Sequence, residues 1–329
     1  MLLAGDIGGT KTVLAVFSPE AGPRAPLAEA TYPSGRYGRL EAIVREFMDQ
    51  VKLAVDRACF GVAGPVVDGT ARVTNLSWLM SESDLMKTFG WSAARLLNDL
   101  ESIAYAVPIL AQDDLHTLNV GVPVQQGSIA VIAPGTGLGE AFMTSEGGRY
   151  HAHASEGGHA SFAPSSELEI GLLSYMRVQL GHGHVSCERV CSGLGIPNIY
   201  YYLKQTSHAE EPAWLTEALA SAADPTPVIM DSAMGKTQRC ELTTATLKTF
   251  ISILGAESGN LALKVLSTGG VYLGGGIPPR ILPALDEPVF LEAFRHKGRF
   301  RELLTQIPVH VILNPKTALL GAAAYGLSM

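Results

Sequence analysis

Residues 2–17 decide the fold, and they read Leu2-Leu3-Ala4-Gly5-Asp6-Ile7-Gly8-Gly9-Thr10-Lys11-Thr12-Val13-Leu14-Ala15-Val16-Phe17. Two apolar runs, the second rich in β-branched residues, flank Gly8 and Gly9, a pattern that predicts a β-hairpin with a tight turn. Glycine in the turn lets backbone N–H groups meet a bulky anion, Thr10 adds a hydroxyl, and Asp6 stands at the end of the first strand. The stretch is therefore either an ordinary tight turn or a phosphate cradle in which Asp6 holds the water shell of a metal ion.

The order of strand, glycine turn and strand occurs a second time at residues 129–143. Its turn, Gly135-Thr136-Gly137, again combines small residues with a hydroxyl. Two half-molecules that each carry one phosphate-binding hairpin would clamp a nucleotide between them, which favours the phosphate interpretation of both turns. A further apolar run at 269–273 ends in Gly274-Gly275-Gly276. Backbone without side chains admits a flat ring, so we expect this turn on the adenine side of the nucleotide.

The composition is that of a compact globular protein. Of the 329 residues, 47% are hydrophobic and 17% are charged, which excludes a disordered chain and favours two moderate domains. The net charge of −7 argues against a nucleic-acid-binding surface, so small ligands are the expected partners. The sequence has no run of about 18 apolar residues and no basic segment before its first apolar run. We therefore expect neither a membrane span nor export.

Cysteine usage agrees with an intracellular protein. The four cysteines, Cys59, Cys187, Cys191 and Cys240, are scattered through the sequence, and free buried thiols are their expected state. The alternative makes Cys187 and Cys191 half of a metal site, but no second Cys/His pair at ligand spacing follows to complete it.

The order of elements predicts an α/β fold with mixed sheets flanked by helices. Strands are expected near 27–32, 58–62, 95–97 and 309–313, with a hairpin turn at Asp68-Gly69. Helices are expected at 40–51, 100–107, 166–180, 241–266 and 316–327. In the longest helix, Gly255 and Gly259 imply a close neighbour. The last helix is rich in small residues and is expected to pack back on the first domain, which gives a smaller domain of residues 1–110 plus 314–329 and a larger domain of residues 111–313.

Asn98 and Asp99 lie where a short strand ends and a helix begins. Asx residues are favoured N-caps, so ordinary capping is one interpretation. The other is catalytic, because α/β sheets place their chemistry at the carboxyl ends of strands and a carboxylate there is a candidate general base. The loop at 74–78 also has two interpretations. It is a surface turn anchored by Trp78, or a sugar-facing loop in which Asn75 binds substrate.

The stretch Ser155-Glu156-Gly157-Gly158-His159 sets an acceptor and a donor/acceptor around two glycines. A carboxylate accepts hydrogen bonds from two hydroxyls and a neutral imidazole serves either role, so Glu156 and His159 suit vicinal sugar hydroxyls. The alternative is a satisfied surface histidine beside a flexible turn. Farther along, Ser186 is a predicted N-cap of a short helix, and the helix dipole alone would explain Glu188 in its first turn.

Six motifs in this order resemble the bacterial glucokinase family, which belongs to the hexokinase, Hsp70 and actin-like ATPase superfamily. They are Asp6-Ile7-Gly8-Gly9-Thr10, Asn98-Asp99, Gly135-Thr136-Gly137-Leu138-Gly139, Ser155-Glu156-Gly157-Gly158-His159, Val185-Ser186-Cys187-Glu188-Arg189 and Gly274-Gly275-Gly276-Ile277-Pro278. The resemblance covers nearly the whole chain. It implies two domains of ribonuclease H-like topology, as in actin-like ATPases, with the active site in the interdomain cleft.

The activity implied by this resemblance is the transfer of the γ-phosphoryl group of Mg-ATP to the 6-hydroxyl of D-glucose in glycolysis, by a cytoplasmic homodimer. Asp99 resembles the catalytic base, and the residues that resemble glucose ligands are Asn98, Glu156, His159 and Glu188. The first phosphate loop is Gly8, Gly9 and Thr10, the second is Gly135, Thr136 and Gly137, and the adenosine loop is Gly274, Gly275 and Gly276. Asp6 is expected to act on Mg²⁺ through water.

The chain departs from related patterns in two places. Many family members have Asn and Arg where this chain has Lys11 and Val13, which leaves details of the first hairpin open. The related ROK sugar kinases and repressors carry a cysteine-rich zinc motif after the residues that correspond to His159. That motif and a helix-turn-helix extension are absent here, so we expect neither zinc at His159 nor a repressor. Two rivals stay open, a kinase for another hexose (mannose, fructose or an N-acetylated amino sugar) and an ATP- or sugar-binding sensor without turnover; an intact Asp99 favours an enzyme.

Overall fold

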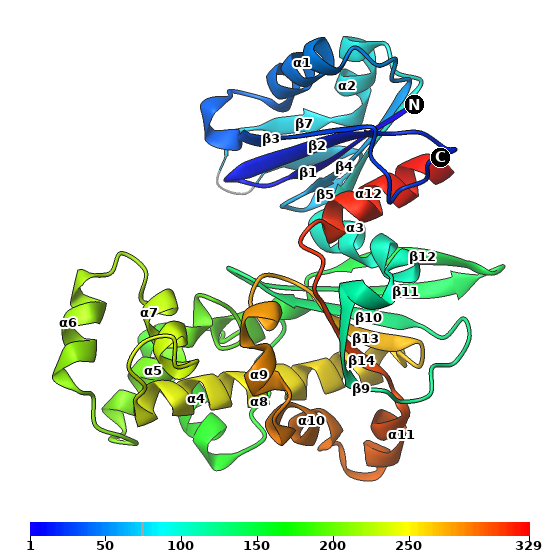
Figure 1. Ribbon diagram of the computed structural model, residues 1–329. Coiled ribbons are helices and arrows are strands. Elements are labelled where there is room, and N and C mark those ends of the chain that lie inside the picture. The colour runs from blue at the N-terminus through cyan, green and yellow to red at the C-terminus, as the bar shows by residue number, and fades with distance from the viewer. Residues whose placement is uncertain (74–75) are drawn as a thin grey trace. The chain divides into compact units, whose positions relative to one another are not determined.

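The computed structural model describes residues 1–73 and 76–329 (Figure 1). The chain divides into two compact units. The first comprises Met1–Asp114, Ala141–Ala154 and Asn314–Met329, and the second comprises Leu115–Glu140 and Ser155–Leu313. These units differ from the predicted domains in residues 111–114 and 141–154, and the domain boundaries given above stay a prediction.

The first unit contains a mixed five-stranded sheet in the order β3-β2-β1-β4-β8. Its strands are β1 (Leu2–Ile7), β2 (Lys11–Phe17), β3 (Ala28–Pro33), β4 (Arg57–Val62) and β8 (Ala93–Asn98). The predicted hairpin at 2–17 is confirmed, because β1 and β2 pair antiparallel from Leu2 with Phe17 to Ile7 with Thr12. Parallel pairing of β1 with β4 and of β4 with β8 makes the sheet mixed, as the sequence predicts.

Helices cover both faces of this sheet (Figure 1). One face packs against α1 (Leu40–Val51) and α2 (Glu82–Phe89), and the other against α3 (Asp99–Ala106) and α12 (Thr317–Ser328). The alternation of strand side chains separates two cores, with Leu3 in the first and Leu2 in the second. The small-residue helix α12 packs on α3 within the first unit. Gly321 is needed there because a Cβ atom would overlap the carbonyl oxygen of Ser102.

A smaller antiparallel sheet in the first unit has the order β5-β6-β7, formed by β5 (Val66–Val67), β6 (Thr70–Arg72) and β7 (Leu79–Ser81). Asp68 and Gly69 connect β5 to β6 with φ angles of 48° and 66°. Two successive positive φ angles define a type I′ turn, which confirms the predicted hairpin. The described part of this unit also contains the 3₁₀ turns η1 (Ser34–Arg36), η2 (Val107–Ile109) and η3 (Gln112–Asp114).

A six-stranded sheet has the order β12-β11-β10-β13-β14-β9. Its strands are β9 (Leu115–Asn119), β10 (Ile129–Pro134), β11 (Leu138–Glu146), β12 (Arg149–Ser155), β13 (Gly270–Leu273) and β14 (Val309–Ile312). Strands β10, β13 and β14 are parallel, and β9 runs antiparallel to β14. The parallel strands are nearly continuous apolar runs because both of their faces are buried.

The helices of the second unit are α4 (Glu167–Gln179), α5 (Gly195–Gln205), α6 (Ala213–Ser221), α7 (Pro225–Ala233), α8 (Glu241–Val265), α9 (Leu282–Leu285), α10 (Pro288–Arg295) and α11 (Arg301–Gln306). Four 3₁₀ turns join them, η4 (Gly157–His159), η5 (Cys187–Arg189), η6 (Pro278–Ile281) and η7 (Gly298–Phe300). The close neighbour predicted for α8 is α10. Cβ atoms at Gly255 and Gly259 would overlap the carbonyl oxygens of Phe290 and Phe294.

Polar contacts join the place where the chain first leaves the first unit to the place where it finally returns to it. Asn314 Nδ2 donates to Asp114 Oδ1 at 3.0 Å, and Arg24 Nη1 lies 2.6 Å from Asp114 Oδ2. The Arg24 guanidinium lowers the pKa of Asp114.

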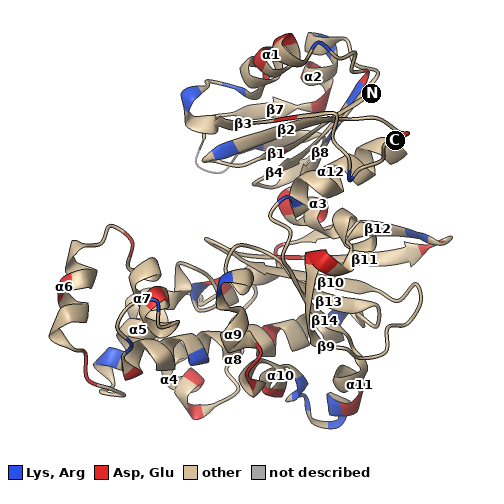
Figure 2. Cartoon of the chain, in the orientation of Figure 1, with Lys and Arg blue, Asp and Glu red and all other residues tan. Residues whose placement is uncertain are grey.

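Elsewhere, basic and acidic residues are interspersed along both units (Figure 2). Among the described residues, no helix is both long enough and apolar enough to cross a bilayer.

Candidate functional site

Asn98 and Asp99 lie at the end of β8 and the start of α3, as predicted. Asn98 caps the helix, because its Oδ1 accepts hydrogen bonds from the amides of Leu100 at 2.9 Å and Glu101 at 3.4 Å. The Glu101 carboxylate accepts from the Asn98 amide in return, which completes a capping box. Asn98 Nδ2 also donates to the Gly64 carbonyl at 3.1 Å. Capping is therefore confirmed, and it holds the carboxamide in one orientation, while sugar binding by Asn98 stays a prediction.

Asp99 is the first residue of α3, and its carboxylate is largely withdrawn from solvent. Burial raises the pKa of Asp99 to about 6, and the negative charge of Asp6 adds to this increase. The Leu100 amide, 2.9 Å from Asp99 Oδ1, opposes it by donating to the ionised form. A carboxylate with a pKa near the working pH is suited to accept a proton during a reaction.

The turn at residues 8–10 is held from outside the hairpin. Ser34 of η1 donates from its hydroxyl to the Gly8 carbonyl at 2.7 Å, and its amide donates to the Thr10 carbonyl at 3.0 Å. Because the Gly8 amide bonds the Lys11 carbonyl at 3.0 Å, the amides of Gly9 and Thr10 are the ones this turn can offer to a phosphate. No sequence pattern pointed to Ser34, because its contact joins residues that are 26 positions apart.

Asp6 is the penultimate residue of β1, next to this turn. Burial raises the pKa of Asp6, while the positive charge of Lys11 opposes that effect. Charge of the opposite sign placed near a buried carboxylate favours its ionised form, so a cation at this position would lower the pKa again.

The second glycine turn packs against the segment that carries Glu188. Gly135 and Gly193 are joined by a hydrogen bond of 2.8 Å from the Gly193 amide to the Gly135 carbonyl. The Leu138 amide donates to Glu188 Oε2 at 2.9 Å, and a Cβ at Gly137 would overlap the same oxygen. Glycine is required at 137 because the carboxylate approaches the backbone so closely. The turn thus both exposes Thr136 and fixes the position of Glu188.

Three of the predicted sugar ligands come together in the second unit. His159 Nε2 lies 3.8 Å from Glu156 Oε2, and His159 Nδ1 lies 3.9 Å from Glu188 Oε1. The Glu156, His159 and Glu188 side chains are 74%, 60% and 24% exposed. The separations are longer than hydrogen bonds, so these polar atoms remain open to ligand hydroxyls.

The turns that carry these ligands are linked through their backbones. The Cys187 amide donates to the Ala160 carbonyl at 2.9 Å, next to an isolated antiparallel bridge between Ser161 and Ser186. The prediction that Ser186 is the N-cap of a short helix is confirmed in position. Ser186 holds the N-cap position, but it makes no capping bond with its hydroxyl, because η5 is a single 3₁₀ turn already closed by the bond from the Arg189 amide to the Ser186 carbonyl.

Glu140 of β11 was missed by the sequence analysis. It is 1% exposed, and its Oε2 lies against Gly157, where a Cβ would overlap it. Burial, together with the charge of Glu257, raises the pKa of Glu140 to about 7. The signal available in the sequence was an acidic residue inside a strand whose neighbours are apolar.

A cavity of about 680 Å³ opens beside the second glycine turn and the triple-glycine turn. Its size is that of pockets for small-molecule ligands, which span roughly 300–1,000 Å³. Gly275 has a φ of 81°, which side chains rarely allow. A Cβ atom at this position would lie 2.5 Å from the Pro134 carbonyl oxygen, so only glycine fits there. The sequence did not anticipate α7 as part of the wall. The lining residues include Gly135, Thr136, Gly193, Thr226, Asp231, Lys236, Gly276 and Arg280.

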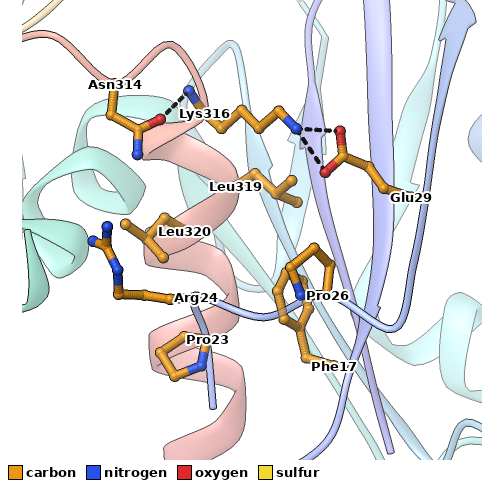
Figure 3. A pocket seen from close by; sticks show the side chains of 9 residues that line it. All are labelled: Phe17, Pro23, Arg24, Pro26, Glu29, Asn314, Lys316, Leu319 and Leu320. Carbon is orange, nitrogen blue, oxygen red and sulfur yellow. Dashed lines mark hydrogen bonds and ion pairs between the residues drawn. The ribbon is translucent and has the colours of Figure 1, made fainter. Parts of the chain in front are cut away.

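A second cavity, of about 150 Å³, lies in the first unit and contains none of the predicted site residues (Figure 3). Lys316 reaches both carboxylate oxygens of Glu29 across its rim, at 2.6 and 2.9 Å (Figure 3). Its volume is below the usual range for ligand pockets, so it is not a candidate for substrate binding.

The remaining predictions concern Asn75, the cysteines and metal binding. Asn75 lies outside the described residues, while Trp78 is buried and donates to the Tyr37 carbonyl at 3.0 Å, which confirms its role as a core anchor. The four cysteines are free, and all except the half-buried Cys240 are buried. Within residues 1–73 and 76–329, no group of three His, Cys, Asp or Glu side chains is arranged to hold a metal ion.

Solved structures define the class. The chain aligns over 100% of its length with 99% of a glucokinase from an Antarctic psychrotroph, at 32% identity and a TM-score of 0.85. A glucokinase from Balamuthia mandrillaris, crystallised with glucose, has the same fold, with a TM-score of 0.80 and 22% identity over 98% of this chain and 92% of that one. The α/β fold with its glycine turns and open carboxylates is that of the sugar kinases with an actin-like ATPase fold, as the sequence predicts.

Sequence comparison gives the family within that class. The chain is 41% identical to a glucokinase of Nostoc punctiforme over 98% of both proteins. The sequence model of the glucokinase family matches residues 3–329, so the chain belongs to the glucokinase family. Its reaction is the transfer of the γ-phosphoryl group of ATP to the 6-hydroxyl of D-glucose, which gives glucose 6-phosphate and ADP.

Proposed function

We propose that Asp99 is the general base of the glucokinase reaction and accepts the proton of the 6-hydroxyl as it attacks phosphorus. Its place at the carboxyl end of β8 and its pKa of about 6 support this role. At neutral pH such a carboxylate is mostly ionised, yet it binds a proton more readily than an exposed one. Asn98 would orient the carboxylate, since its side-chain carboxamide donates to the ionised form of Asp99.

Glucose is proposed to bind Glu156, His159 and Glu188, with Asn98 and Asn75 as further ligands. The observation that carries this assignment is the convergence of three side chains whose polar atoms lie 3.8 and 3.9 Å apart and remain open. Carboxylates accept from sugar hydroxyls, and a bond to a charged acceptor contributes about 1.5–3 kcal/mol. Because Glu188 is itself fixed by the Leu138 amide at 2.9 Å, it supplies a preorganised acceptor.

ATP is proposed to bind along the glycine turns. Gly8, Gly9 and Thr10 would contact phosphate, as would Gly135, Thr136 and Gly137. Gly274, Gly275 and Gly276 would face adenosine. The cavity of about 680 Å³ next to Gly135, Thr136 and Gly276 supports the assignment of the second and third of these turns. Phosphoryl transfer requires mainly positioning and charge stabilisation, both of which backbone amides provide.

Mg²⁺ is proposed as the cofactor, held by Asp6 through water. A carboxylate is the hard oxygen ligand that Mg²⁺ prefers, and the raised pKa of the half-buried Asp6 is an energetic cost that a cation would offset. When bound, the ion neutralises charge on the transferred phosphoryl group. Asp6→Asn should raise the Mg²⁺ concentration at half-maximal rate by about 10- to 100-fold, as substitutions of outer-shell partners do. An unchanged Mg²⁺ requirement would contradict the assignment.

The decisive experiment is a coupled assay of ADP formation with glucose, combined with calorimetric glucose binding. Asp99→Asn should lower kcat by about 10²–10⁴-fold, the usual contribution of a general base, with the Kd for glucose unchanged. Glu156→Gln should instead weaken glucose binding about 10- to 150-fold, which corresponds to one charge-assisted hydrogen bond. Near-full kcat in the first variant rejects the base, and unchanged glucose binding in the second rejects that ligand.

The same assay with mannose, fructose and N-acetylated amino sugars would measure the breadth of hexose specificity.

We propose a cytoplasmic homodimer on the strength of the family resemblance alone. Sedimentation analysis at micromolar concentration should give a mass of about twice the 34.8 kDa chain, and a single-chain mass would reject the dimer. Cell fractionation tests the location.

A further inference from the structure

Glu140 lies against the loop that carries two of the proposed sugar ligands. Its side chain is 1% exposed, and its Oε2 is in direct contact with Gly157, at a position where any Cβ would overlap the oxygen. Gly157 lies between Glu156 and His159. The Glu140 carboxyl therefore packs against the backbone that carries both of those side chains.

The same part of β11 supports all three proposed ligands. The Leu138 amide donates to Glu188 Oε2 at 2.9 Å, and the Leu138 carbonyl packs so closely on Gly158 that a Cβ there would overlap it. Side chains two residues apart in a strand share a face, so Glu140 lies on the same side of β11 as Leu138. The relative positions of Glu156, His159 and Glu188 are thus set by one short segment.

The surroundings of Glu140 make its ionisation costly. Among the described residues, its Oε1 atom has no hydrogen-bond partner. The charges facing it come from α8, where Glu257 raises the pKa of Glu140 and Lys264 lowers it. Lys264 Nζ lies 3.3 Å from Glu257 Oε1, so this cation is already shared. The Cys187 thiol of η5 also interacts with Glu140 and is itself buried.

We propose that Glu140 is a positioning residue of the glucose site, whose neutral carboxyl supports the 155–159 loop and whose ionised form displaces it. The physical reason is that a buried carboxylate without a partner seeks water or a donor, and the loop on its Oε2 is the part that can move to admit one. Glucose binding then depends on pH through a residue that does not touch the sugar. The inference rests on the proposed assignment of Glu156 and His159 as sugar ligands.

The test measures the Kd for glucose by calorimetry from pH 5.5 to 8.5 in the unmodified protein and in Glu140→Gln. Glutamine has the shape of the neutral acid and cannot ionise. Because His159 is common to both proteins, the quantity compared is the ratio of the two Kd values at each pH. We expect this ratio to be near one at the acid end of the range. Above pH 8 the unmodified protein should bind glucose about tenfold more weakly than Glu140→Gln, because a tenfold change follows if bound glucose raises the pKa of Glu140 by about one unit.

A ratio that stays constant with pH would overturn the proposal. Glu257→Gln keeps Glu140 and removes the facing carboxylate, so the midpoint of the pH-dependent change should move to lower pH. An unmoved midpoint counts against the electrostatic cause, even if Glu140→Gln fails to fold. In turnover assays the effect should fall on the KM for glucose and not on the KM for ATP. Glu156→Gln tests the ligand assignment separately. At pH 6 its glucose Kd is compared with that of the unmodified protein, and this comparison does not involve the Glu140→Gln variant.

Discussion

Replacing Glu140 by Gln should stabilise the folded protein at neutral and alkaline pH. Burial and the facing Glu257 raise the pKa of Glu140 from its ordinary value of 4.5 to about 7. Each unit of pKa difference corresponds to about 1.4 kcal/mol, so keeping this carboxylate ionised in the folded state costs about 3 kcal/mol. Glutamine fills the same volume without the charge and avoids that cost.

The sign of the pH dependence follows from the raised pKa. In the folded protein Glu140 holds its proton up to about pH 7, whereas in the unfolded chain it releases it near pH 4.5. The stability that its protonated form contributes is complete below about pH 4.5 and is lost as the pH rises through about 7. The unfolding free energy of Glu140→Gln minus that of the unmodified protein should therefore grow by about 1.4 kcal/mol per pH unit between these values and then level off.

Urea unfolding at one-unit pH intervals from 5 to 8 measures this difference, and amide hydrogen exchange in β10 and α8 localises it to the second unit. Glu169→Gln is the matched control. Glu169 is nearly as buried as Glu140, with 2% of its surface exposed. Unlike Glu140, it accepts hydrogen bonds from the Ser165 amide at 2.6 Å, the Ser165 hydroxyl at 2.9 Å and the Ser252 hydroxyl at 3.2 Å. In Glu169→Gln an NH₂ group replaces one of the accepting oxygens and faces these donors, so the substitution should destabilise the folded protein by about 1–3 kcal/mol. A pH-independent difference, or a destabilised Glu140→Gln, would refute the reasoning.

Three further outcomes are expected. The kcat/KM for glucose should fall tenfold per pH unit below about 6, because Asp99 must be ionised to act as a base; a profile without an inflection near 6 speaks against it. Gly321→Ala should destabilise by about 3 kcal/mol or more in thermal or urea unfolding, because its Cβ overlaps the Ser102 carbonyl, whereas Gly35→Ala, with nothing within 4 Å, should change stability little. Gly275→Ala should raise the KM for ATP, since a positive φ and contact with the Pro134 carbonyl distort the cavity wall; equal KM values would place ATP elsewhere.

Local sequence signals were sufficient for much of the architecture and for part of the site. The hairpin at 2–17, the type I′ turn at Asp68-Gly69 and the capping by Asn98 each depend on residues within one turn or one pair of strands. Such features are encoded by hydrophobic periodicity and by backbone preferences of glycine and Asx residues, which act over a few positions. Ser186 holds the N-cap position that the sequence predicts, but its hydroxyl makes no capping bond, and the neighbourhood of its short 3₁₀ turn is fixed by the bond from the Cys187 amide to the Ala160 carbonyl.

Sequence patterns were enough to predict the class of fold, the glycine turns and the identity of the open acidic side chains. How these groups are held depends on contacts that form only in the folded chain. Glu188 is fixed by the amide of Leu138, 50 residues earlier, and the turn at Gly8 is held by Ser34, 26 residues later. Contacts of this kind depend on which distant strands and turns come together in the fold. Hydrophobic periodicity reports only on residues a few positions apart, so it cannot predict them. For the same reason Glu140, an ordinary acidic residue in the sequence, becomes a buried carboxyl against the sugar loop only in the fold.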